Sequence, residues 1–181
     1  MHHVAGTSLS GAINTLSGSR GAPTTSYVVQ DKNLVSMVPE DCAPWTNGRW
    51  KSNLHSITFE MVNAGGSAAT GFLPPSADTI ETTAQAMARA TLRWNIGPLE
   101  YGINVFGHKD VSKSATACPG SLDLKAVVAR ANAILEEYRI GKLPAAGEGE
   151  DKEEPETDLT GVAAELAVIR DSIDNIIKLI S

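Results

Sequence analysis

The chain is poor in cysteine, in aromatic residues and in positive charge, and it has no long hydrophobic run. Its 181 residues include two cysteines, Cys42 and Cys118, and 5% aromatic residues, with a net charge of -6. Two cysteines do not make a disulfide-rich scaffold, and no basic stripe with interleaved aromatic residues indicates a nucleic-acid-binding surface. Because we find neither a signal peptide nor a run of about 18 apolar residues, we expect no membrane insertion and free thiols.

The negative charge is concentrated at the C-terminal end. Residues 143–181 contain ten acidic and three basic residues, whereas residues 1–142 contain eleven acidic and twelve basic residues. Within this acidic part, residues 141–157 are rich in Gly, Ala, Glu and Pro, and such a composition cannot bury enough apolar surface to fold. The sequence therefore predicts one domain over residues 1–140, followed by a linker over 141–157.

The last segment, residues 158–181, carries a heptad pattern. Its apolar residues are spaced alternately three and four apart: Leu159, Val162, Leu166, Ile169, Ile173, Ile176 and Ile180. This spacing predicts an amphipathic helix, although about three heptads are near the lower limit for a coiled coil. A single helix cannot cover its own apolar stripe, so we predict that it forms a homo-oligomer or docks on the domain. The β-branched residues of the stripe favour three or four strands over two.

Periodicity and capping residues predict the main elements of residues 1–140. Three helices are expected over residues 8–18, from Ser76 or Asp78 to about 94, and over 122–139. A hairpin is expected from strands 26–30 and 34–38, with loops over 39–53 and 64–76. Residues 56–63 alternate and predict a strand with Ile57, Phe59 and Met61 on one face and a mostly polar second face. A further strand is expected from Ile103 to Phe106.

That last strand leads into His108, and Cys118 follows ten residues later in the sequence Cys118-Pro119-Gly120. Imidazole and thiolate are ligands that suit zinc. A catalytic zinc site usually has three protein ligands and one open position. A third ligand must therefore be found, and the remaining histidines are His2, His3 and His55.

Four separated pieces of the sequence resemble the zinc-dependent N-acetylmuramoyl-L-alanine amidases, a family that includes phage endolysins and peptidoglycan recognition proteins. They are His2-His3-Val4-Ala5-Gly6, the hairpin from Ser26 to Asp31, the strand from Asn53 to Asn63, and Gly107-His108-Lys109-Asp110-Val111 with Cys118-Pro119-Gly120. The resemblance covers residues 1–138 and is greatest to endolysins. It implies an α+β fold with a mixed central β-sheet flanked by helices.

The resemblance also implies the roles of individual residues. His2, His108 and Cys118 match the metal ligands, and Glu60 matches the general base that acts on a zinc-activated water. Thr116 matches a position near the developing oxyanion. Family members have a full strand before the first histidine, whereas here only Met1 precedes His2, so we expect His2 to be the least well anchored ligand.

Several alternatives to these roles stay open. Glu60 could be a solvated residue on the polar face of its strand, and Thr116 could be an ordinary loop residue. Trp45 and Trp50 could stack on sugar or pack under their loop. The family's tyrosine and histidine at two further positions are replaced here by Thr25 and Thr46, which places the substrate contacts of the family in doubt.

The resemblance implies a hydrolase that cleaves the bond between the muramic acid lactyl group and L-alanine of peptidoglycan, with Zn²⁺ as cofactor. We expect synthesis in the cytoplasm of a host bacterium and action at the cell wall after release. The alternatives are a peptidoglycan-binding protein without catalysis, a cytoplasmic amidase that recycles soluble muropeptides, and a virion protein in which the C-terminal helix is the main functional part.

Overall fold

The computed structural model describes residues 1–17 and 21–143. Almost all of the expected linker, which we placed at 141–157, lies outside the described residues. The expected heptad helix over 158–181 lies wholly outside them. The linker, the helix and the homo-oligomer therefore stay predictions from the sequence.

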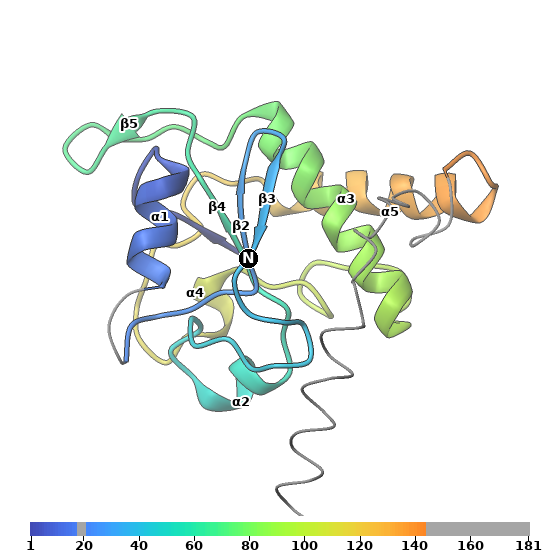
Figure 1. The fold of residues 1–181 in the computed structure, drawn as a ribbon, viewed down its shortest axis with the longest axis horizontal. Helices are drawn as coiled ribbons and strands as arrows, with labels where there is room; N and C mark the ends of the chain where they lie inside the picture. Colours follow the sequence, from blue (N-terminus) through green and yellow to red (C-terminus); the bar gives the residue numbers. More distant parts are fainter. Residues whose placement is uncertain (18–20, 144–181) are drawn as a thin grey trace, which may run out of the picture. The chain divides into compact units, whose positions relative to one another are not determined.

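A mixed four-stranded sheet forms the centre of the domain (Figure 1). Its strand order is β1-β4-β2-β3, and the strands span His2–His3, Phe59–Met61, Tyr27–Gln30 and Asn33–Ser36. Strands β1 and β2 both run parallel to β4, whereas β2 and β3 form an antiparallel hairpin. The turn between β2 and β3 places Asp31 at φ 52°, a conformation that Asp tolerates better than most residues. The expected hairpin and the mixed sheet are confirmed.

Three helices cover the two faces of this sheet, as Figure 1 shows. Helices α3 (Ala77–Trp94) and α5 (Leu124–Arg139) pack against one face in the main hydrophobic core, and α1 (Leu9–Leu16) packs against the other face in a smaller core. Ser8, Ser76 and Asp123 cap the three helices by accepting backbone N–H groups. Because a capping side chain satisfies an otherwise unpaired donor, these starts follow from the sequence. All three expected helices are confirmed.

Strand β4 has the expected apolar and mostly polar faces, and both are buried. Phe59 and Met61 pack in the core with α3 and α5. On the other side, Thr58, Glu60 and Val62 are 2%, 8% and 1% exposed. The strand lies between two parallel neighbours. On its second face, α1 packs on Val62, while Thr25 bonds to Thr58 and Thr46 bonds to Glu60. The expected strand with a mostly polar second face is confirmed, and the structure adds that this polar face is buried.

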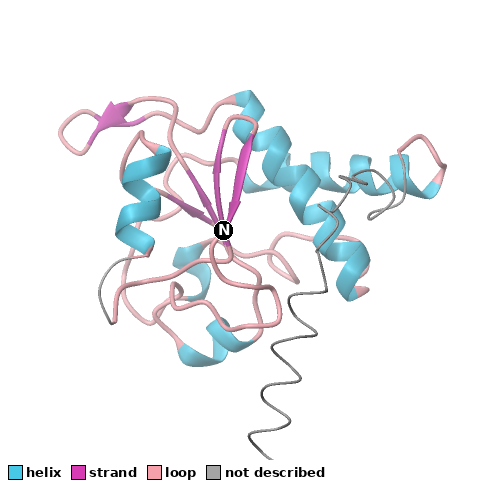
Figure 2. Cartoon of the chain, in the orientation of Figure 1, coloured by secondary structure: helices cyan, strands magenta, loops and turns pink. Residues whose placement is uncertain are grey.

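Three further expectations need correction, and Figure 2 shows the elements concerned. Residues 103–106 form no strand, because the carbonyl of Glu100 accepts the N–H groups of residues 103, 104 and 105 and turns the chain there. Ile103 is consequently 65% exposed. The expected loop 39–53 contains the start of a short helix, α2 (Trp50–Leu54), and the expected loop 64–76 contains a two-stranded hairpin, β5 (Gly66–Ser67) and β6 (Gly71–Phe72).

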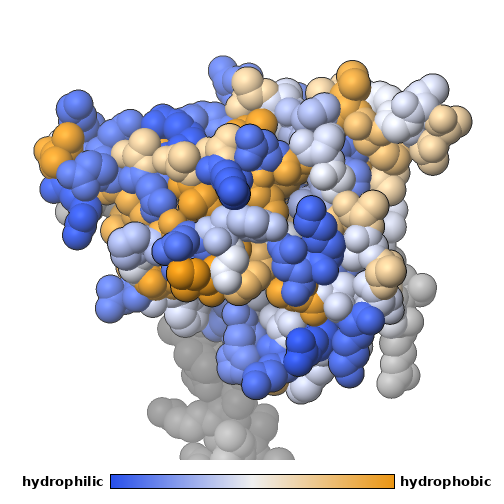
Figure 3. Space-filling view, turned by 180° about the vertical axis from the view of Figure 1, so that it is seen from behind, coloured by the Kyte–Doolittle hydropathy of each residue, from blue (hydrophilic) through white to orange (hydrophobic). Residues whose placement is uncertain are grey.

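The surface carries no continuous apolar band on the face shown in Figure 3, where apolar patches alternate with polar side chains. Within residues 1–17 and 21–143, no helix combines the length and the apolar character needed to cross a membrane.

Candidate metal centre and catalytic base

Three side chains that are far apart in the sequence converge beside β1, an edge strand of the sheet. His2 lies on β1, His108 is the first residue of α4 (His108–Val111), and Cys118 lies in the loop that follows. One ligand atom from each lies within 4.8 Å of the others. The Cys118 Sγ atom is 3.8 Å from His2 Nδ1, and the two imidazole rings have centroids 4.5 Å apart. The structure thus brings together the three residues predicted as metal ligands.

The loops that carry His108 and Cys118 hold each other in place. The Lys109 N–H donates to the Cys118 carbonyl over 2.9 Å, and the Gly107 N–H donates to the Asp110 carboxylate over 2.7 Å. A Cβ atom on Gly107 would lie 2.8 Å from Pro119 Cδ, which is closer than real contacts allow. Glycine at 107 therefore permits the close approach that places the histidine beside the cysteine.

His2 is firmly held, contrary to the expectation that it would be the least well anchored ligand. It is 2% exposed, and β1 pairs with β4 in a register that aligns His2 with Glu60. The His108 N–H donates to the Met1 carbonyl over 3.1 Å. In addition, His2 Nε2 lies 3.0 Å from Asn47 Oδ1. Backbone and side chain together fix the direction of the imidazole.

Glu60 lies beside this cluster and is buried. Because paired residues on neighbouring strands project to the same face, the alignment with His2 brings the two side chains together. Glu60 Oε1 is 3.6 Å from His2 Nδ1, and the Thr46 hydroxyl donates to the same oxygen over 3.4 Å. Burial raises the pKa of the Glu60 carboxyl to about 7. This position does not fit the alternative of a solvated surface residue.

The protonation of the three candidate ligands follows from their burial. Burial lowers the pKa of His2 to about 3 and also lowers the pKa of His108, so both rings are neutral near pH 7 and can offer a lone pair. Burial raises the pKa of the Cys118 thiol to about 11, and a nearby cation is needed to hold it as a thiolate. Two neutral imidazoles and one thiol are a donor set that fits zinc.

The other candidate residues occupy different places. The Thr116 hydroxyl accepts the Cys118 N–H over 3.1 Å and so supports the ligand loop. His3 Nδ1 is 3.2 Å from Asn63 Oδ1, and its ring contacts Phe72 edge-on, beside the cluster and not in it. His55 is exposed at the end of α2 and lies outside the cluster.

The segment 45–56 borders the site with Trp45, Thr46 and Trp50, which the sequence singled out, and with Asn47, which it did not. Trp45 and Trp50 are 53% and 56% exposed, with ring centroids 5.7 Å apart, so they form an exposed pair and are not packed under the loop. Thr46 contacts Glu60 and Asn47 contacts His2. No periodicity marks this segment, and the contact of Asn47 with His2 is shown only by the structure.

Thr25, the other position that departs from the family, is not available to a substrate. Its exposure is 0%, and its hydroxyl lies 3.0 Å from the Thr58 hydroxyl in the interior.

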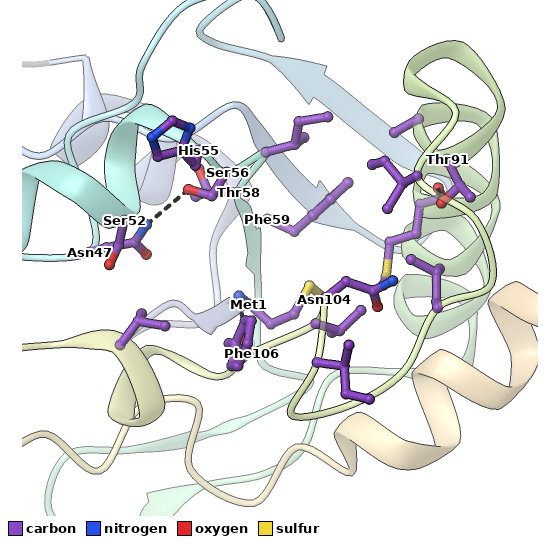
Figure 4. Close-up of a pocket in the computed structure, with 18 of the residues that line it drawn as sticks. Met1, Asn47, Ser52, His55, Ser56, Thr58, Phe59, Thr91, Asn104 and Phe106 are labelled. Atoms are coloured by element: carbon purple, nitrogen blue, oxygen red, sulfur yellow. Dashed lines mark hydrogen bonds between the residues drawn. The ribbon is translucent and has the colours of Figure 1, made fainter.

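A cavity of about 640 Å³ opens on the far side of the segment 45–56, between β4, α3 and the loop 96–106 (Figure 4). It is lined by none of the predicted metal ligands or catalytic residues.

Comparison with known protein families gives one match. The family model described as N-acetylmuramoyl-L-alanine amidase matches residues 1–121. No curated protein sequence gives a significant match.

Several solved structures share the fold. AmpDh3 from Pseudomonas aeruginosa, in complex with an anhydromuramic pentapeptide, superposes with a TM-score of 0.56 at 19% identity, over 79% of this chain and 66% of that chain. AmiD from E. coli, in complex with the substrate anhydro-N-acetylmuramic acid-L-Ala-D-gamma-Glu-L-Lys, gives 0.58 at 22% identity, over 72% of this chain and 55% of that chain. A mutant endolysin from Bacillus subtilis superposes with a TM-score of 0.55 at 20% identity, over 72% of this chain and 81% of that chain. The chain thus spans just under two thirds of AmpDh3 and about half of AmiD.

Proposed function

The chain belongs to the N-acetylmuramoyl-L-alanine amidase family, and we propose that it hydrolyses the amide bond between the lactyl group of muramic acid and L-alanine in peptidoglycan, in the manner of a phage endolysin. The observation that carries this proposal is the convergence of His2, His108 and Cys118 beside the buried carboxyl group of Glu60.

We propose that these three side chains hold one Zn²⁺ ion. Such an ion would lower the pKa of the attacking water towards about 7 and polarise the scissile carbonyl. The burial of His2 and His108 keeps their imidazoles neutral and directed at the site. The loop contacts of Cys118 hold its sulfur near His2 before any substrate arrives.

Glu60 is the proposed general base. Its carboxylate takes a proton from the attacking water and delivers it to the amine nitrogen of L-alanine as the amide bond breaks. Its place on β4, the strand between β1 and β2, fixes the carboxyl group relative to His2. Thr116 is the proposed neighbour of the oxyanion: its oxygen accepts the Cys118 N–H, and its O–H remains a donor.

The substrate class is supported by the relatives with bound ligands. AmpDh3 and AmiD were solved with anhydromuramic peptides, in which a muramic acid unit is linked to a peptide stem. Such ligands also favour a second candidate, an amidase that acts on soluble muropeptides. Rates on intact peptidoglycan and on soluble anhydromuramyl peptides, measured with one enzyme preparation, distinguish the two.

The reaction itself is tested by the groups that appear on incubation with purified peptidoglycan. We expect new L-alanine amino termini, no new reducing sugar ends, loss of activity with a chelator and recovery with added zinc. Release of reducing ends without free amines would overturn the amidase proposal, because that product requires cleavage between sugars.

The exposed pair Trp45 and Trp50 is proposed to contact the glycan part of the substrate. Replacing both by alanine should raise the half-saturating concentration of peptidoglycan about tenfold with little change in kcat, since aromatic contacts contribute about 0.5–1.5 kcal/mol each. Trp94→Phe is the matched control, because Trp94 lies at the end of α3 and bonds to Glu40. Equal effects on a muramyl substrate and on one lacking sugar would contradict this contact.

A further inference from the structure

Asn47 is a buried polar residue whose side-chain oxygen, side-chain nitrogen and backbone N–H each have a hydrogen-bond partner. It is 4% exposed, and its Oδ1 atom lies 3.0 Å from His2 Nε2. Its Nδ2 donates to the Ser56 hydroxyl over 3.0 Å, a contact drawn in Figure 4, and its N–H donates to Asn53 Oδ1 over 2.9 Å. Asn53 is 1% exposed. The side-chain amide is thus held between His2 and Ser56, and the backbone of the residue is held by Asn53.

This contact decides which nitrogen of His2 carries the proton. A neutral imidazole has one N–H and one lone pair, and the Asn47 Oδ1 atom can only accept a hydrogen bond. With Oδ1 facing His2, as in this structure, the N–H is at Nε2 and the lone pair is on Nδ1. That atom lies 3.8 Å from Cys118 Sγ, inside the cluster of candidate ligands. The opposite tautomer would direct an N–H, and no lone pair, toward the other candidate ligands.

We propose that Asn47 is a positioning residue that holds the His2 imidazole with Nδ1 free for the metal and thereby increases zinc affinity. This inference rests on the proposed function, since it requires that His2 is a zinc ligand. Partners of this kind on the second nitrogen of a ligating histidine typically change metal affinity by about 10–100-fold. Nothing in the sequence pattern indicated Asn47, because 45 residues separate it from His2.

Zinc affinity, measured by competition with a chromophoric chelator, tests this role in the full chain. Asn47→Leu keeps a similar shape without an acceptor and should weaken zinc binding by about 10–100-fold. Asn47→Asp should restore affinity to near that of the original chain, because its carboxylate accepts from His2 and the Ser56 hydroxyl can rotate to donate to it. Thr46→Val, which alters the neighbouring contact to Glu60, should leave zinc affinity unchanged.

A measurement on the unaltered chain keeps the inference testable if Asn47→Leu does not fold. Nitrogen-15 NMR of the histidine rings should show His2 protonated at Nε2, both without zinc and with it. Protonation at Nδ1 in the zinc-free chain, or equal zinc affinity of the original chain and Asn47→Leu, would overturn the role of Asn47. Failure of the original chain to bind zinc would instead overturn the proposed metal site.

Discussion

Replacing Glu60 by glutamine should lower the rate of amide hydrolysis by about 10²–10⁴-fold and leave zinc binding intact, because general acid–base catalysis contributes effects of this size. Glutamine has nearly the same shape and can still accept the Thr46 hydroxyl, which lies 3.4 Å from Oε1. Its amide cannot take a proton from water. The measurement is the initial rate of amine release from peptidoglycan, together with zinc content after dialysis.

A second carboxylate-to-amide change controls for the general effect of such a substitution. Glu81 lies on α3 and bonds to Arg130, away from the metal cluster. Glu81→Gln should retain the full rate, since the pair with Arg130 lies at the surface and such pairs contribute about 0–1 kcal/mol to stability. An unchanged rate for Glu60→Gln would show that another group moves the proton.

Replacing Cys118 by serine should abolish stable zinc binding and reduce activity at least about a hundredfold, because a ligand contributes more than the partners that orient it. Serine keeps the size of the side chain but offers a hydroxyl in place of a thiolate. Zinc should also stabilise the original chain against unfolding, by about 2.7 kcal/mol at a free concentration one hundred times Kd. The variant should lose this increase in melting temperature.

Cys42→Ser is the matched control for this substitution. Cys42 is the other cysteine of the chain and is exposed, outside the cluster of candidate ligands. It should keep both activity and the zinc-dependent rise in melting temperature. A Cys118→Ser variant that binds zinc as tightly as the original chain would remove Cys118 from the ligand set.

Elements that depend on local interactions were predictable from the sequence. Helices α1, α3 and α5 begin at capping residues and follow apolar spacing, which are properties of neighbouring residues. The β2–β3 hairpin depends on a short turn between two apolar runs. The order and spacing of the motifs around His2, His108 and Cys118 were enough to predict that these three residues meet.

Patterns of neighbouring residues do not determine the structure where contacts with distant parts of the chain decide pairing and burial. The apolar run from Ile103 to Phe106 has the composition of a strand, but the Glu100 carbonyl accepts the N–H groups of residues 103–105 and turns the chain there. The Met1 amino group donates to the Phe106 carbonyl at the end of this run without making it a strand. Likewise, the alternation of residues 56–63 predicts a strand with a mostly polar second face but does not specify whether that face is exposed or buried. It is buried because α1 packs on Val62, and the segments before β2 and before α2 contact Thr58 and Glu60.

The sequence by itself therefore determined the family resemblance, the main helices, the hairpin and the identity of the candidate ligands, since these depend on residue type and on spacing along the chain. Only the tertiary structure decided that Glu60 is buried beside His2 and that Asn47 accepts from the second nitrogen of the same ring. The physical reason is that burial and hydrogen-bond partners are set by segments 45 to 58 residues away from His2, which no local pattern specifies.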